Sequence, residues 1–251
     1  MKLQFIIIAI LVFGQNCFSM EDKPDYLITQ EYTLEIWEFP LESYFKNDSR
    51  PDYLFADVTD KDYNLKSYVA YWQLRNDSLF LVKVNVNSKD IPLGRIFKNV
   101  KKKYEVYAFW YNASITTKKG KLLAGMLPEF EDIYSFKNGI LTGKETNHYS
   151  FFSESDYTNN PELLMNYIQD NLDYTTLDEP FEKAKVYVQI FGVSESGVID
   201  SVGIIRGWDR ARDSEAIRVV KSIPKWTVIH KNGKHFDFTW TIPVKFGHNE
   251  K

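Results

Sequence analysis

The stretch His235-Phe-Asp-Phe-Thr-Trp-Thr-Ile-Pro-Val-Lys-Phe246 decides how the second half of this chain folds. Apolar side chains occupy every second position from Phe236 to Phe246, and Asp, Thr, Pro and Lys lie between them. Alternation with a period of two is typical of a strand with one buried face. Pro243 has no N–H to donate, so we expect this strand to lie at or near a sheet edge. An open edge can accept a strand from another protein.

The residues before this strand predict a helix followed by two strands. Asn160 can cap a helix that begins at Pro161 and ends near Asp173. Two apolar runs, Val186–Val193 and Val198–Arg206, then form a hairpin, because the Ser-Glu-Ser-Gly between them is a turn sequence.

A second helix is expected between this hairpin and the last strand. Asp213 suits its N-cap, and Pro224 stops it because the residue before a proline avoids the α region. The expected order is helix, strand, strand, helix, strand. We therefore predict an α+β fold whose C-terminal αββαβ domain has a three-stranded antiparallel sheet covered by two helices.

Residues 25–155 predict a separate β-rich domain. Ser67–Leu74 and Leu79–Val86 form two strands across a tight turn, and Lys137–Gly139 is the turn of a second hairpin. Lys118–Lys121 is predicted as another turn. The polar run Ser153–Asn160 is predicted as the boundary to the next domain, which covers 159–249.

Two further segments of the first domain have predicted structures. Pro92–Val100 is expected to be a short helix. Tyr104–Tyr111 is predicted as an aromatic strand, whose rings either pack in the core or line a groove that binds a ligand. Packing is the preferred interpretation, since aromatic residues are common in strands.

The first 19 residues resemble a targeting segment. Lys2 precedes the apolar run Phe5–Phe13, which is too short to span a bilayer. We expect a signal peptide, residues 1–19, cut after Ser19, and hence a periplasmic protein without a spanning segment in its mature chain. Acylation of Cys17 in a lipoprotein and an uncleaved signal anchor are the alternatives. Cys17 is the single cysteine, so the mature protein would hold no disulfide.

Composition excludes several classes of function. The net charge of −3 gives no basic surface for nucleic acid or for anionic lipid. The sequence has no Gly-rich phosphate loop, no His-Glu-x-x-His and no Gly-x-Ser-x-Gly. We therefore expect neither an enzyme nor a bound cofactor.

Two groups of polar residues are candidate sites. His230 and His235 flank the turn Lys231–Lys234 and are expected to approach each other, but no cysteine or carboxylate motif accompanies them, so no metal site is predicted. Asp209, Asp213 and Glu215 lie among arginines at a helix start. Capping and solvated ion pairs explain that acidic group without catalysis.

The last 90 or so residues resemble the C-terminal domain of the TonB family. The likeness is carried by these segments: Val186-Tyr-Val-Gln-Ile-Phe-Gly-Val193, Gly197-Val198, Ile205-Arg206-Gly207, Asp213-Ser-Glu-Ala-Ile-Arg-Val-Val-Lys221, Ile223-Pro-Lys-Trp226, Asn232-Gly-Lys234 and Ile242-Pro-Val-Lys-Phe246. The resemblance implies a periplasmic protein that contacts outer-membrane transporters. A transporter segment would add to the sheet edge at His235–Phe246, and the resemblance thus makes His235, Asp237, Thr239 and Thr241 the partner-binding residues.

The chain also departs from the energy transducers of that family. It lacks their long Pro-rich linker and their spanning N-terminal helix, and Thr175 follows Tyr174 where the family often has proline. An adaptor role therefore stays open beside energy transduction and support of transmembrane transport. The alternative function is an exported ligand- or protein-binding module that uses the aromatic groove of the first domain and has no role in transport.

Overall fold

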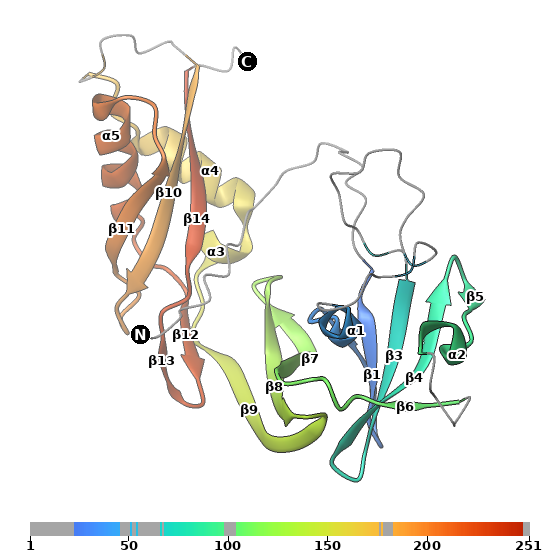
Figure 1. Cartoon of the computed structure of the whole chain (residues 1–251). Coiled ribbons are helices and arrows are strands. Elements are labelled where there is room, and N and C mark those ends of the chain that lie inside the picture. Colours follow the sequence, from blue (N-terminus) through green and yellow to red (C-terminus); the bar gives the residue numbers. More distant parts are fainter. Residues whose placement is uncertain are drawn as a thin grey trace. The chain divides into compact units, whose positions relative to one another are not determined.

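The computed structural model describes residues 23–45, 51, 54, 66, 68–97, 104–175, 177 and 183–247. The predicted signal peptide and Cys17 lie outside this described part. The predicted α+β class is confirmed: helices accompany one sheet of 11 strands and one of 3 (Figure 1). Among the described helices, none combines the length and the apolar character needed to cross a membrane.

The chain divides into two compact units. The C-terminal unit contains Lys121–Glu129 and His148–Lys251, and the N-terminal unit contains Asn16–Gly120 and Phe130–Asn147, in each case as far as these residues are described. Strands β7 (Ser114–Leu123), β8 (Leu127–Lys137) and β9 (Ile140–Ser153) contribute residues to both units.

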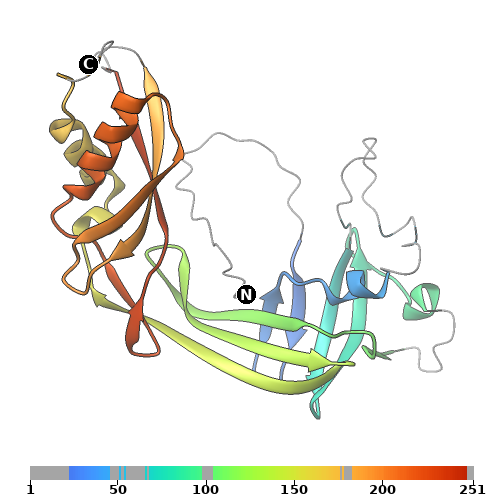
Figure 2. The same cartoon turned by 60° about the vertical axis from the view of Figure 1, so that its left-hand side comes forward.

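The C-terminal unit is built on a three-stranded antiparallel sheet in the order β11-β10-β14. Helices α4 and α5 lie on the same face of this sheet in both views (Figure 1, Figure 2). The elements of this unit after β9 are as follows: α3 (Asp156–Asn159), α4 (Pro161–Asn171), β10 (Ala184–Val193), β11 (Ile199–Arg206), α5 (Arg210–Lys221), β12 (Val228–Lys231), β13 (Lys234–Phe236) and β14 (Trp240–Phe246).

The core of the C-terminal unit lies between the sheet and its helices. Val188 of β10 and Val244 of β14 are fully buried on the covered face, and Ile168 of α4 is buried against them in the same cluster. Trp226 is also buried, and its ring meets that of Trp240 edge to face at 5.6 Å. The alternation of apolar residues along β10 and β14 therefore fixes which face the helices cover.

The prediction of one strand over His235–Phe246 is wrong. The chain forms β13, then leaves strand geometry over Asp237–Thr239, and begins β14 at Trp240. The two pieces have different partners, since β13 pairs with β12 and β14 pairs with β10. Alternation alone could not reveal this break because Phe238, between the two strands, is also buried.

Helices α4 and α5 are both capped at the N-terminus by an Asn or Asp side chain, as expected, but the cap of α5 is a different residue from the one predicted. Asn160 caps α4 as predicted, and its side chain accepts a hydrogen bond from the N–H of Leu163. The predicted cap of α5 at Asp213 is wrong, because Asp209 occupies the N-cap and accepts from the N–H of Arg212. Asp213 lies one turn further on and accepts from the N–H of Trp208.

The N-terminal unit is rich in short strands around its own core. Its elements before β7 are as follows: β1 (Asp25–Ile28), β2 (Thr33–Ile36), α1 (Pro40–Tyr44), β3 (Tyr68–Arg75), β4 (Ser78–Val86), β5 (Lys89–Asp90), α2 (Leu93–Ile96) and β6 (Val106–Tyr107). The predicted hairpin β3–β4 is confirmed, with Asn76 and Asp77 in the left-handed region. The hairpin β8–β9 turns at Asn138 and Gly139, as predicted, but its strands are longer.

Three local predictions in this part of the chain are corrected. Lys118–Lys121 is no turn but part of β7, and the turn falls at 124–126. Within Tyr104–Tyr111 the strand is limited to β6, because the N–H of Tyr111 bonds to the carbonyl of Ala108 and closes a turn. The helix predicted from Pro92 shrinks to the single turn α2, although 98–100 lie outside the described residues.

Candidate functional site

Strand β14 lies at one edge of the three-stranded sheet. Its register with β10 is continuous over seven pairs, from Ala184 opposite Phe246 to Ile190 opposite Trp240. In the sheet order β11-β10-β14, its other side has no strand partner among the described residues. An edge of this kind presents main-chain donors and acceptors that another strand can use.

The main-chain groups on the open side of β14 can be assigned from the alternation of antiparallel pairing. Pro243 has no N–H that could form a hydrogen bond with β10. Two residues further on, the carbonyl of Lys245 accepts a hydrogen bond of 2.9 Å from Nε2 of Gln169 on α4. Both observations indicate that Thr241, Pro243 and Lys245 turn their main-chain groups outward. The open side then carries the N–H and carbonyl of Thr241, the carbonyl of Pro243 and the N–H of Lys245. We call these groups the β14 edge. The two groups of Thr241 are largely covered, because the whole residue is 7% exposed.

The structure separates the four residues predicted to bind a partner. Thr241 belongs to β14, but the residue is 7% exposed and its Oγ1 is buried, so the expectation that its side chain points outward to select a partner is wrong. Thr239 and the exposed Asp237 lie between strands. His235 is in β13, away from the β14 edge, and its Nε2 lies 3.1 Å from Oδ1 of Asp237.

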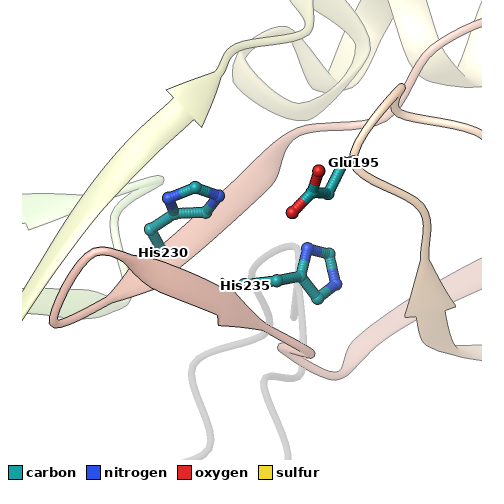
Figure 3. A group of neighbouring side chains, drawn as sticks. All are labelled: Glu195, His230 and His235. Carbon is teal, nitrogen blue, oxygen red and sulfur yellow. The ribbon is translucent and has the colours of Figure 1, made fainter.

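A second group of side chains comes together at the β12–β13 hairpin. Asn232 and Gly233 take positive φ in its turn, which sets His230 directly opposite His235. Glu195, in the turn between β10 and β11, reaches the same place (Figure 3). The ligating atoms of these three side chains all lie within 4.8 Å of one another. We call Glu195, His230 and His235 the histidine cluster.

Each histidine of the cluster has a buried nitrogen without a hydrogen-bond partner in the described part of the chain. These atoms are Nε2 of His230 and Nδ1 of His235. A buried polar atom left without a partner costs about 1–3 kcal/mol. One ring nitrogen of His235 faces the Glu195 carboxylate while the other is turned away (Figure 3).

Neighbouring residues hold both imidazole rings in place. The ring of His230 stacks on that of Phe152 in β9, with 4.4 Å between centroids and 8° between planes. Asp237 holds His235 through the 3.1 Å contact at Nε2. When Nε2 donates this hydrogen bond, the lone pair of the neutral ring lies on Nδ1, which faces the cluster.

A cavity of about 380 Å³ adjoins the cluster. Three carboxylates, those of Glu195, Asp200 and Asp237, line it together with His235. Such a lining favours a cation over an anion.

The other two predicted groups have structural roles. In the acidic group, Asp209 caps α5, and Glu215, further along the helix, is 6% exposed and accepts hydrogen bonds from the guanidinium of Arg218 and from the N–H of Asp173. In the aromatic stretch, the hydroxyl of Tyr111 donates to the carbonyl of Ser114 and the indole of Trp110 donates to that of Pro40. Capping thus accounts for Asp209, whereas the expectation of a solvated ion pair is wrong for Glu215, which is buried. Packing accounts for Tyr111 and Trp110, but Tyr104 and Phe109 of the same stretch are exposed.

Glu195 is the member of the histidine cluster that sequence reasoning missed. It is 35 positions before His230, in a turn sequence that gives no sign of a ligand. The only signal in the sequence was a pair of histidines on either side of a turn, which indicated that the two side chains approach each other. The third residue is brought to them by tertiary structure, which the local sequence does not encode.

Comparison with known proteins gives no relative from which a function could be carried over, since the chain matches no family model, no curated protein and no solved structure. The resemblance to the TonB C-terminal domain therefore stays a prediction.

Proposed function

We propose that this chain is an exported, periplasmic TonB-like protein that binds a segment of an outer-membrane transporter by β-strand addition at the β14 edge. The layout behind the proposal is a β-rich domain followed by an αββαβ domain. The observation that carries the proposal is the edge position of β14, which leaves the main-chain groups on its open side without a strand partner in the described part of the chain. On this proposal the protein assists transmembrane transport through recognition, and no catalytic step is assigned to it.

The β14 edge limits what can bind. It provides two donors and two acceptors, because Pro243 lacks an N–H and the carbonyl of Lys245 already accepts from Gln169. A partner strand would therefore gain a short ladder of main-chain hydrogen bonds, and its side chains would have to supply the rest of the affinity. The exposed side chain of Lys245 favours an acidic residue in the partner.

The test uses two substitutions at one position. Thr241→Pro removes one outward N–H, and it loses no side-chain hydrogen bond because Oγ1 of Thr241 has no partner in the described part of the chain. Thr241→Val has nearly the same shape and keeps that N–H. The mature chain should be used whole, because Leu123 and Leu127, far from β14 in sequence, belong to the core of the C-terminal unit.

Each protein is immobilised, exposed to outer-membrane extracts and checked for folding by circular dichroism. We expect the wild type and Thr241→Val to retain the same transporter, identified by mass spectrometry, and Thr241→Pro to lose it. Equal retention by a folded Thr241→Pro would exclude the β14 edge as the contact. Absence of any transporter from the wild-type eluate would argue against the proposed class of partner.

A further inference from the structure

The histidine cluster has the composition of a transition-metal site. Two imidazoles and one carboxylate are a ligand set that Zn²⁺ accepts, whereas Mg²⁺ and Ca²⁺ take oxygen ligands. The two unpartnered nitrogens, Nε2 of His230 and Nδ1 of His235, have no hydrogen-bonding role in the described part of the chain that would compete with a metal. We propose that Glu195, His230 and His235 bind a divalent transition-metal ion of the Zn²⁺ class.

The surroundings of the cluster fit this assignment. Metal-binding histidines usually donate their second ring nitrogen to a carboxylate or carbonyl, which orients the ring and selects the tautomer. Asp237 has this relation to His235, at 3.1 Å from Nε2. The stacking of His230 on Phe152 fixes the other ring. Both nitrogen ligands are thus oriented by contacts that do not involve an ion.

The distances require a small closure around the ion. Ligand atoms at the usual Zn–N and Zn–O lengths in a tetrahedral site are about 3.3 Å apart. The three ligating atoms now lie within 4.8 Å of one another. The ring centroids of His230 and His235 are 6.4 Å apart, too far for both rings to reach one tetrahedral ion where they stand. Closure therefore requires the two imidazoles to approach each other, together with rotation of the side chain of Glu195, which is exposed and lies in a turn.

Three protein ligands leave one position of a tetrahedral ion open for water or another small ligand. The cavity lined by Glu195, His235, Asp200 and Asp237 adjoins the cluster and gives this position access to solvent. Bound metal would also link two turns that are distant in the sequence, those of β10–β11 and of β12–β13. Metal binding should therefore stabilise the C-terminal unit, since an ion that binds only the folded state shifts the folding equilibrium.

The test is titration of the whole, tag-free protein with Zn²⁺ by calorimetry, together with the visible spectrum after addition of Co²⁺. We expect one ion per chain, a spectrum of tetrahedral Co²⁺ and a higher melting temperature with Zn²⁺. Glu195→Gln, which alters an exposed turn residue, and His235→Gln should each remove this binding. Asp237→Asn should weaken it by about 10–100-fold, the usual effect of losing an outer-shell partner.

His148→Gln is the matched control, because His148 is an exposed histidine of β9 outside the cluster. It should bind Zn²⁺ as the wild type does. Circular dichroism confirms that each variant is folded. A wild type that binds no Zn²⁺, or a folded Glu195→Gln that binds it with unchanged affinity, would overturn the assignment. Equal losses in His148→Gln and Glu195→Gln would do the same, since they would indicate adventitious surface binding.

Discussion

The ion-pair network around Asp132 leads to a prediction on how stability depends on pH. Asp132 lies on β8, with its side chain 3% exposed, and its Oδ2 is 2.6 Å from Nζ of Lys119 and 3.2 Å from that of Lys144. Thr146 donates to its other oxygen at 2.6 Å. Burial by itself would raise the pKa of this carboxyl, but the hydrogen bonds from Lys119, Thr146 and Lys144 outweigh burial and lower the pKa to about 2.

The magnitude follows from linkage. The ordinary pKa of aspartate is 3.8, and its value in the folded chain is about 2. At 1.36 kcal/mol per pH unit this difference amounts to about 2.5 kcal/mol. Because the folded pKa of Asp132 is the lower one, this stabilisation is fully present above pH 3.8. It is lost as the pH falls toward 2.

The assay compares wild type and Asp132→Asn by urea unfolding between pH 7 and pH 2. The asparagine does not titrate, so the difference in free energy of unfolding between the two proteins should shrink by about 2 kcal/mol over this range. Asp90→Asn is the control, because Asp90 pairs with Lys83 at an exposed position and should change the profile by less than about 0.5 kcal/mol. A wild-type advantage that is the same at pH 7 and pH 2 would refute the role given to Asp132.

Three further substitutions should destabilise the chain by amounts that its contacts set. In the buried ion pair, Nζ of Lys66 lies 2.7 Å from Oδ1 of Asp25. Lys66→Met leaves this carboxylate without its cation and should lower the free energy of unfolding in urea by about 3–5 kcal/mol; a loss under about 1 kcal/mol would contradict a buried pair. Asp209→Ala removes the cap of α5 and should cost about 1 kcal/mol, measurable as lost helicity on heating. Gly197→Ala places a Cβ 2.9 Å from the carbonyl of Trp226 at a φ of +87°, so the melting temperature should fall by several degrees; an unchanged value would show that this turn can relax.

Local chemistry made part of this fold predictable from the sequence. The α4 cap at Asn160 and the turns at Asn76 and Gly139 depend on residues that are neighbours in the chain, and the structure has them where the sequence placed them. The α5 cap failed for a local reason too. Asp209 and Asp213 both suit an N-cap, and the choice depends on which carboxylate can reach the free N–H groups.

Other features depend on contacts that local patterns do not encode. The apolar alternation continues through Phe238, but the partner strand changes from β12 to β10 on either side of it. Likewise, the approach of His230 to His235 follows from the turn between them, whereas the arrival of Glu195 depends on how two hairpins pack. The sequence therefore predicted the pair of histidines but not the three-residue ligand set.

The break between β13 and β14 separates the proposed metal site from the proposed partner-binding edge. A substitution can therefore remove one activity and leave the other intact. His235 and Thr241 were expected on one strand, where any change in one would disturb the other. In the structure they pair with different strands, and β14 is held by seven register pairs with β10 and by its own buried side chains. Changes at positions without shared contacts are usually additive. Thr241→Pro should then leave Zn²⁺ binding unchanged, and His235→Gln should leave transporter capture unchanged. If either substitution affects both measurements, the segment 237–239 transmits between the two sites.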